Sequence, residues 1–491
     1  MGIQVHLRGD ESDGRHAVVA PARRASDRRW LSLAFIALAQ LMIALDATIV
    51  SIALPSAQAA LSASDADRQW VVTAYTLTFG GLLLLGGRVA DHLGRKRAFL
   101  LGLAGFALAS LLGGATPSFV VLVGARALQG AFAALLAPTA LSLLAVSFTE
   151  PRERATAFAV YGSIAGTGAA AGLLLGGVLT QFLDWRWCLF VNVPVALVAA
   201  VGGRFALPAW RAHPQRPFDL AGAVLATGGL AALVFGCAEA VTLGWGSARV
   251  TGGLAAGAVL LVLFVLWERR APRPLLPLRI VLDRSRAGAY LTVALTMAGM
   301  FGAFLFLTYY LQVVLGSSPL QAGLAFLPLT AASQAGSWGI ARRLMPRVPP
   351  RALMVPGALV AAAGMALLTR LPAGGGSLTQ VLPAEIVLGL GTSCAMVPAF
   401  STATQRVDPR EAGVASATVN TAQQVGGSLG TVLLNTVAAS ATAAYVAAHP
   451  AALVHGYTVA MAWGVAILVL GAIAAGGLIT AGRPAPREES R

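Results

Sequence analysis

Uninterrupted apolar stretches about twenty residues long occupy most of this chain, and they constrain its fold more than any other feature. An α-helix rises 1.5 Å per residue, so about twenty apolar residues cross the roughly 30 Å of hydrocarbon in a bilayer. A helix also satisfies its backbone hydrogen bonds within one segment, which hydrocarbon requires. We therefore expect an all-α integral membrane protein. Fourteen stretches have this length, with approximate cores at 31–53, 70–89, 98–116, 119–146, 155–180, 188–207, 219–241, 250–267, 287–313, 321–341, 351–370, 379–401, 412–440 and 456–481.

The basic residues are distributed asymmetrically between the loops. With the N-terminus in the cytoplasm, thirty of the 35 Lys and Arg fall in the two tails or in cytoplasmic loops, and Arg126 lies inside a span. The remaining four face outside: Arg68, Arg186, Arg249 and Arg370. An excess of Lys and Arg indicates the cytoplasmic side of a membrane protein, so both termini are predicted to be cytoplasmic. Topology thus explains the net charge of +15, and no nucleic-acid partner is expected.

Two loop sequences occur twice at one separation. "RAFLLG" from residue 97 resembles "RALMVPG" from 351, and "EPRERATA" from 150 resembles "DPREAGVASA" from 408, each pair about 255 residues apart. Parallel six-helix repeats are typical of secondary transporters, which bind cargo between two halves. We predict a disordered cytoplasmic tail at 1–29, a first six-helix bundle at 30–210, two inserted transmembrane helices at 211–270, a cytoplasmic linker at 271–286, a second six-helix bundle at 287–482 and a cytoplasmic tail at 483–491.

The sequence also limits the energy source. A phosphate-binding loop for ATP ends in Gly-Lys-Ser/Thr, but the only lysine is Lys96, which Arg97 follows. Pumping therefore has to use an ion gradient or a separate subunit. No loop exceeds about 25 residues and no histidine lies in a predicted span, so a soluble catalytic domain and the usual general base are both missing. We expect a transporter and not an enzyme; a membrane-embedded receptor or enzyme is the less favoured alternative.

Several stretches resemble the major facilitator superfamily. "GRVADHLGRKR" (87–97) resembles its motif between helices 2 and 3, and "LVGARALQGAFAA" (122–134) resembles its fourth-helix motif. Four further stretches are similar to the fourteen-helix drug:proton antiporters of the EmrB/QacA type: "LDATIVSIALP" (45–55), "QWVVTAYTL" (69–77), "WRWCLFVNVP" (185–194) and "REAGVASATVNTAQQVGGSLG" (410–430). The resemblance implies the major facilitator fold, with two six-helix bundles and two inserted helices, and drug efflux in exchange for protons.

Four positions depart from the pattern of these relatives. Ser51 stands where Asn is usual, His92 replaces an Arg, and Gln423 replaces an Arg that is common in relatives. Leu173 follows Gly172 where relatives carry the proline that bends the fifth helix.

One acid and one base lie inside predicted spans at equal depth. Asp46 and Arg126 are each about seven residues from the outer end of their span, which puts both roughly 10 Å below the surface, where they can meet. An unpaired charge there costs at least about 2.5–3.5 kcal/mol, which pairing or protonation of Asp46 reduces. Two interpretations stay open: protonation of Asp46 weakens the contact and so uses a proton gradient, or a static pair orients two helices. The resemblance favours proton coupling.

The loop at 87–97 has a structural and a functional interpretation. Gly87 and Gly94 allow close packing and a sharp turn, and Asp91 can pair with a neighbouring arginine. The resemblance implies that Asp91 latches the two halves near Pro409–Gly413, whereas the basic residues alone are explained as topology signals. The candidate latch residues are Gly87, Asp91, Gly94, Arg95 and Arg97.

A run of glycines marks the fifth span. Gly168, Gly172 and Gly176 recur every four residues and share one helix face, followed by Gly177. Small residues let another helix approach closely, which explains the pattern without a further role. The resemblance implies a seal against proton leak.

Polar residues in other spans are candidates for a substrate cavity. They are Gln129, Glu385, Asn420, Gln423 and Gln424. Glu385 could bind a cation or a second proton, while hydrogen bonds between helices explain the last three equally well. Glu239, in the inserted pair, is interpreted as an interfacial residue.

Together these features predict a proton-motive-force-driven exporter of hydrophobic or cationic drugs in the inner membrane, working by alternating access. The alternative is a dedicated exporter of one metabolite or self-made antibiotic. We expect no cofactor or metal and only protons as coupling ion; the partners expected are the small-molecule substrate, membrane lipid and accessory export proteins.

Overall fold

The computed structural model describes residues 20–64, 67–148, 150–207, 219–271, 274–276, 278–372, 378–404, 412–445 and 451–480, and these residues form helices and loops without a strand. The helices are α1 (Ala20–Ala60), α2 (Trp70–Leu93), α3 (Arg95–Ala115), α4 (Phe119–Ser147), α5 (Pro151–Phe182), α6 (Trp187–Phe190), α7 (Asn192–Ala206), α8 (Leu220–Leu243), α9 (Ala248–Arg270), α10 (Leu278–Val281), α11 (Arg284–Tyr309), α12 (Pro319–Ala325), α13 (Leu327–Ala335), α14 (Arg342–Leu344), α15 (Arg351–Leu368), α16 (Leu378–Thr404), α17 (Ala412–Ala444) and α18 (Ala451–Leu478). π-Helical segments, Tyr310–Val314 and Gly336–Ala341, follow α11 and α13.

Local sequence signals set several helix ends. The side chains of Asp219, Ser247 and Asp283 accept hydrogen bonds from backbone N–H groups in the first turns of α8, α9 and α11, which satisfies donors that a helix start leaves unpaired. Gly94, with φ of 85°, connects α2 to α3. This left-handed conformation favours glycine and provides the sharp turn that the sequence predicts.

Ten helical segments of the described chain are long and apolar enough to cross a membrane. The prediction of an all-α membrane protein is therefore confirmed. The four predicted spans outside this set, at 70–89, 155–180, 321–341 and 412–440, are helical too. A break at Phe326 divides the third of them, and Ser, Thr, Asn and Gln dilute the apolar residues of α17. The count of fourteen spans remains a prediction.

The N-terminal helix starts earlier than expected. The predicted tail covered residues 1–29, but α1 begins at Ala20, because the helix continues through the polar residues before the apolar core. Residues 1–19 and the predicted tail at 483–491 lie outside the described residues. The predicted linker contains the short helix α10.

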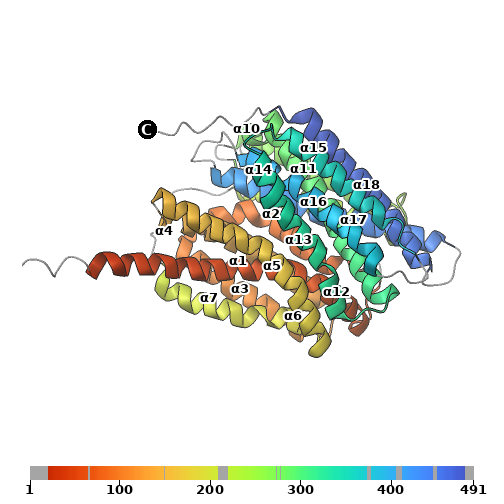
Figure 1. The fold of residues 1–491 in the computed structure, drawn as a ribbon, viewed down its shortest axis with the longest axis horizontal. Coiled ribbons are helices and arrows are strands. Elements are labelled where there is room, and N and C mark those ends of the chain that lie inside the picture. The colour runs from red at the N-terminus through yellow and green to blue at the C-terminus, as the bar shows by residue number, and fades with distance from the viewer. Residues whose placement is uncertain are drawn as a thin grey trace, which may run out of the picture.

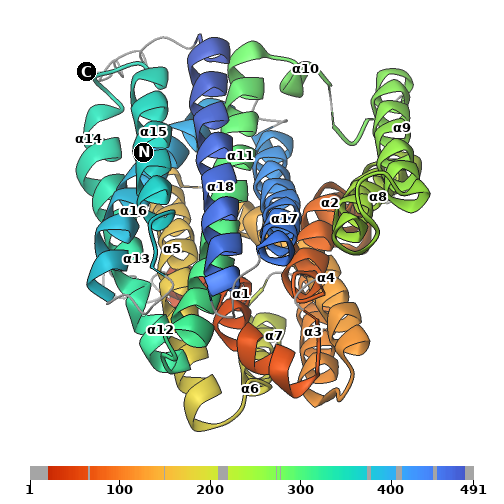
Figure 2. The same cartoon turned by 90° about the vertical axis from the view of Figure 1, so that its right-hand side faces the viewer.

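The helices pack in two groups with one repeated pattern (Figures 1 and 2). In the first group α1 packs on α5, α4 on α2 and α3, and α7 on α1 and α3. In the second group α11 packs on α17, α16 on α13 and α15, and α18 on α11 and α15. Each contact of the first group thus has a counterpart in the second, as a chain built from two related halves requires. We call the two groups the first half and the second half.

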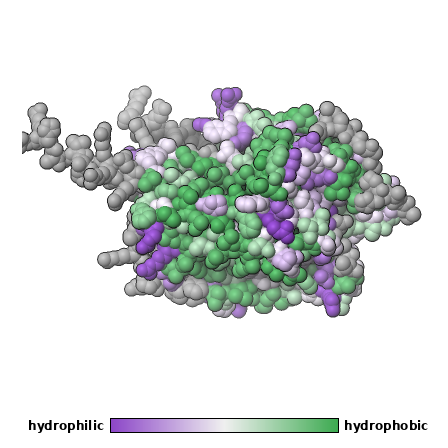
Figure 3. Space-filling model, turned by 90° about the horizontal axis from the view of Figure 1, so that it is seen from below, coloured by the Kyte–Doolittle hydropathy of each residue, from purple (hydrophilic) through white to green (hydrophobic). Residues whose placement is uncertain are grey.

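Two equivalent helix pairs join the halves: α2 with α17, and α5 with α12. The helices α8 and α9 form a hairpin, and α8 packs against α2 and α17 at the edge of the bundle (Figure 2). The outside of the molecule is strongly apolar, with large exposed side chains such as Val120 and Phe205 and a broad hydrophobic surface in Figure 3. Such a surface is explained by contact with lipid tails.

Candidate functional site

A buried ion pair lies at the centre of the first half. Arg126 Nη1 on α4 donates to Asp46 Oδ2 on α1 at 2.6 Å. The Asp46 side chain is 0% exposed and the Arg126 side chain 2%. The contact expected from their equal depth is therefore formed. Two charges so far from water remain stable only if their other hydrogen-bonding atoms also find partners.

Three neutral side chains complete the site. Asn192 Nδ2, on α7, donates to Asp46 Oδ1 at 2.8 Å, and Gln129 Nε2 donates to the same oxygen at 3.2 Å. Gln129 Oε1 accepts from Arg126 Nη1 at 2.9 Å, and its Nε2 also donates to Ser110 Oγ on α3 at 2.7 Å. Gln129 was predicted to line a substrate cavity. In the structure it is fully buried and bridges the acid and the base, and its role in a substrate cavity stays a prediction.

Helix α2 also contacts the guanidinium of Arg126. Arg126 Nε donates to the carbonyl oxygen of Val71 at 3.0 Å, and its Cζ lies 4.3 Å from the centre of the Tyr75 ring, which is a cation–π contact. We call Asp46, Arg126, Gln129, Asn192 and Ser110 the ion-pair network. With α2 included, the network joins five helices of the first half.

The glycines of α5 determine how closely α1 packs against α5. A Cβ atom on Gly168 would lie 2.8 Å from Ala44 Cβ, one on Gly172 2.7 Å from the Leu45 carbonyl oxygen, and one on Gly176 2.8 Å from the Ile49 carbonyl oxygen. The three glycines therefore face the turns of α1 that surround Asp46. Gly177 faces the second half, where a Cβ would lie 2.8 Å from Leu320 Cα.

Leu173 lies in the same contact between the two halves. Its side chain is buried, and its carbonyl oxygen would lie 2.6 Å from a Cβ added to Gly323 of α12. The leucine that replaces the family's proline thus lies where α5 and α12 cross. In the second half, where the helices equivalent to α1 and α4 meet, Thr392 Oγ1 donates to Met300 Sδ at 3.3 Å.

A second polar cluster joins the two halves near the start of α2. Arg68, which counting of loop charges placed outside, is only 3% exposed. Its Nε donates to Asn435 Oδ1 on α17 at 3.3 Å, and its Cζ lies 4.0 Å from the centre of the Tyr309 ring on α11. The Tyr309 hydroxyl donates in turn to Gln58 Oε1 on α1.

Further hydrogen bonds between halves lie at the same end of the molecule. Gln312 Nε2 donates to the Ile52 carbonyl oxygen at 2.9 Å, and the Leu320 backbone N–H donates to Gln181 Oε1 at 3.2 Å. We call this set, with the Arg68 contacts, the α1–α2-end contacts. Sequence reasoning missed them because they join residues more than 130 positions apart in the chain.

The candidate latch is described only in part. The Asp91 side chain and residues 405–411, which include Pro409, lie outside the described residues. Gly94 forms the turn, and Arg95 and Arg97 begin α3. Gly86 and not Gly87 provides the close packing: a Cβ on Gly86 would lie 2.6 Å from the backbone carbon of Ala134 on α4, whereas one on Gly87 would make an ordinary 3.6 Å contact.

The remaining cavity candidates lie in the second half. Gln423 Nε2 is 3.6 Å from Met297 Sδ on α11, while the Cβ of Gln424 packs against Gly80 of α2. Asn420 is half-buried on the same helix. Glu385 on α16 is buried away from all of them, beside a cavity next to α12. The structure thus brings Gln129 to the ion-pair network and leaves the other four candidates apart from it.

Comparison with known proteins agrees with this architecture. Residues 36–431 match the profile of the Major Facilitator Superfamily. The chain is 56% identical to the puromycin resistance protein pur8 of Streptomyces alboniger, over 92% of each chain, and 39% identical to the cephamycin export protein CmcT of Amycolatopsis lactamdurans, over 89% of each. The solved structure of the POT family transporter PepTSo has the same fold, with a TM-score of 0.68 at 15% identity over 92% of this chain and 97% of that one. The chain therefore belongs to the Major Facilitator Superfamily, and it is a membrane transporter related to antibiotic resistance and export proteins, not an enzyme.

Proposed function

We propose that this protein exports an antibiotic in exchange for protons, as a fourteen-span antiporter of the EmrB/QacA type. The observation that carries the proposal is the ion-pair network, in which a carboxylate and a guanidinium are kept together, almost fully buried, in a membrane protein. The resistance and export functions named for its relatives support the direction of transport.

The energy of the pair supports proton coupling. Breaking a buried ion pair by neutralising one partner costs about 3–5 kcal/mol. A proton that moves down about 150 mV releases about 3.5 kcal/mol. Because these energies are comparable, binding of one proton to Asp46 can change which arrangement of the helices is favoured. Arg126, released from Asp46, then has to find other acceptors, and this drives the change between the two access states.

Water has to reach Asp46 for this exchange to occur. The nearby cavity between α1, α2, α4 and α6, lined by Val50, Val71 and Leu122 among others, is apolar and has a volume of about 10 Å³. A cavity this small and apolar does not hold water stably. Proton exchange therefore accompanies a movement of the halves, which couples the proton to the change in access.

The α1–α2-end contacts form the gate in this proposal. Arg68 is bound to Asn435 and lies on the Tyr309 ring, so separation of the halves at this end has to break both contacts. With both termini on the cytoplasmic side of the inner membrane, this end faces outside, and its contacts keep cargo from leaving until the halves exchange states. Reporter fusions at the two termini and in the α1–α2 loop test this orientation: an externally accessible terminus would contradict it.

The cargo is proposed to be one antibiotic, because the two relatives described above carry names of single compounds. A multidrug exporter of hydrophobic or cationic compounds is the second candidate, supported by the resemblance of its motifs to drug:proton antiporters. Expression in a drug-sensitive host separates the two. Raised tolerance to puromycin alone supports a dedicated exporter, and tolerance to several unrelated cations supports multidrug export; unchanged tolerance to every compound would contradict antibiotic export.

A further inference from the structure

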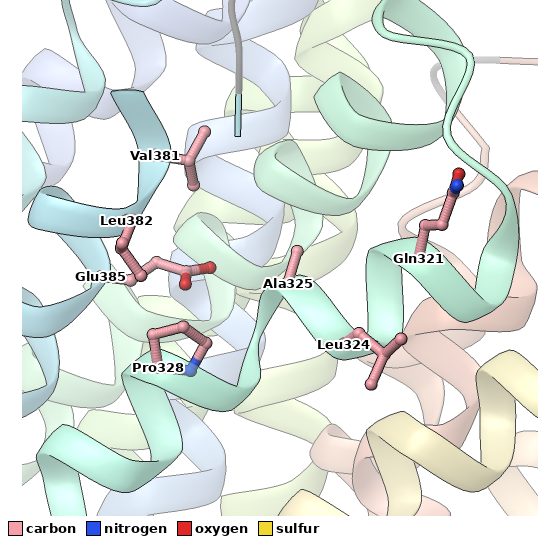
Figure 4. A pocket seen from close by; sticks show the side chains of 7 residues that line it. All are labelled: Gln321, Leu324, Ala325, Pro328, Val381, Leu382 and Glu385. Carbon is pink, nitrogen blue, oxygen red and sulfur yellow. The ribbon is translucent and has the colours of Figure 1, made fainter. Parts of the chain in front are cut away.

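A cavity of about 310 Å³ lies between α12, α13 and α16, apart from the ion-pair network (Figure 4). Its wall is apolar and includes Leu324, Pro328, Val381 and Leu382. The cavity lies where the helix is interrupted at Phe326, between α12 and α13, and Pro328 follows this interruption. The volume is within the range of cavities that hold small molecules.

The cavity opens on the flank that faces away from the centre of the molecule. Leu324 is 47% exposed and Leu382 is 41% exposed, and both lie at the rim. On the opposite side of α12, Ala322 and Phe326 are fully buried in the core that includes α1 and α11. In a membrane this outward flank faces lipid, so a compound dissolved in the bilayer reaches the cavity without passing between the halves.

Glu385 introduces a carboxylate into this apolar space. Its side chain is 1% exposed, and Figure 4 shows it directed from α16 toward α12 and α13. Its Oε1 has no hydrogen-bond partner among the residues that the structure describes. A buried carboxylate oxygen without a hydrogen-bond partner is costly, and a bound cation would offset this cost.

The lining indicates which cation. Apolar walls favour a lipophilic body, and one carboxylate favours a single positive charge on it. A phospholipid headgroup brings a phosphate as well as an amine, but none of the residues that line the cavity is basic. We propose that this cavity is a binding site for a lipophilic organic cation, with Glu385 as its counter-charge, loaded from the membrane. The binding site itself does not depend on the proposed function; only the identification of its ligand as export cargo rests on it.

The test is equilibrium binding of radiolabelled tetraphenylphosphonium to the purified full chain in phosphatidylcholine nanodiscs. The probe carries a permanent charge, so its own protonation does not change with conditions. Glu385→Gln keeps the shape of the side chain and removes its charge, and it should weaken binding at least about tenfold, or 1.4 kcal/mol. Glu239→Gln, which removes a carboxylate from α8 away from the cavity, should bind like the wild type.

A second variant distinguishes binding in the cavity from binding elsewhere on the protein. Leu324→Trp should also weaken binding, because it fills the cavity and keeps the carboxylate, and thermal unfolding in detergent verifies that each variant is folded. Unchanged affinity in Glu385→Gln, equal loss in Glu239→Gln, or no measurable binding to the wild type overturns the proposal. Loss of wild-type binding when phosphatidylethanolamine is added overturns it too, since a lipid headgroup is then the occupant.

The binding measurement uses no proton gradient, so its result does not depend on the proposed proton-coupled export. If the wild type binds through Glu385 but exports nothing, the proposed function fails and the site remains; if export is intact and Glu385→Gln binds normally, only the site fails.

Discussion

Replacing Asp46 with asparagine tests whether the pair of Asp46 and Arg126 couples transport to protons or only orients two helices. The carboxylate accepts hydrogen bonds at 2.6 Å from Arg126, 2.8 Å from Asn192 and 3.2 Å from Gln129. The side-chain amide of the new asparagine has one acceptor oxygen and one N–H₂ donor group. On one side, this donor group therefore faces the donors that the carboxylate of Asp46 accepted from. At least one charge-assisted bond is lost, worth about 1.5–3 kcal/mol, and with the unpaired Arg126 the total cost is about 3–5 kcal/mol.

The assay is efflux into everted membrane vesicles with an imposed proton gradient, alongside membrane abundance and thermal unfolding of the purified protein. Asp46→Asn should insert normally, unfold at a lower temperature and lose gradient-driven transport. The double variant Asp46→Asn/Arg126→Gln removes the second charge as well, so it should regain most of the stability but none of the coupled transport.

A static pair predicts a different result for the double variant. If the pair only orients α1 and α4, removing both charges should restore stability and transport together. Recovery of transport in the double variant, or normal efflux in Asp46→Asn, would refute proton coupling through this pair.

Three further substitutions test the neighbouring contacts. Asn192→Ala removes a donor to Asp46 and should cost about 1–3 kcal/mol of stability, with a changed pH profile of efflux; an unchanged profile and unfolding temperature would show that this bond does not matter. Gly172→Ala should impair transport because its Cβ meets the backbone of α1, whereas Gly124→Ala, where a Cβ meets nothing within 4 Å, should not; equal effects would contradict this packing. Arg68→Ala should lower disulfide cross-linking between Gln181→Cys and Leu320→Cys, since it removes a hydrogen bond and a cation–π contact between the halves, while exposed Arg249→Ala should not; unchanged cross-linking would exclude Arg68 from the gate.

The sequence predicted the ion pair but not its surroundings. Depth along a helix follows from counting residues, so Asp46 and Arg126 could be matched without a structure. The direction in which a side chain points does not follow from counting, so the contacts of Gln129 with Asp46 and Ser110 were not predicted. Asn192 carries no charge to mark it within its apolar stretch, although it lies in a motif shared with relatives.

The contacts between halves were harder to predict for the same reason. Arg68 has the position of a loop residue that sets topology, and its burial depends on Tyr309 and Asn435 in the other half. Likewise, the close packing assigned to Gly87 belongs to its neighbour Gly86, since one residue turns a helix face by about 100°. Glu385 was recognised as a candidate, but the break at Phe326 beside it was not predicted, although Pro328 within the predicted span at 321–341 is a signal of such a break.

Proton movement caused by substrate is the most direct test of the central claim that the buried pair couples transport to protons. Purified protein is reconstituted into vesicles that contain a pH-sensitive dye, puromycin or the compound identified by the susceptibility assay is added outside, and protein-free vesicles give the background. We predict that entry of the compound drives protons out of the wild-type vesicles and raises the internal pH, and that Asp46→Asn shows only the background. Wild-type transport of the compound without a pH change, or the same pH change in Asp46→Asn, would contradict the claim.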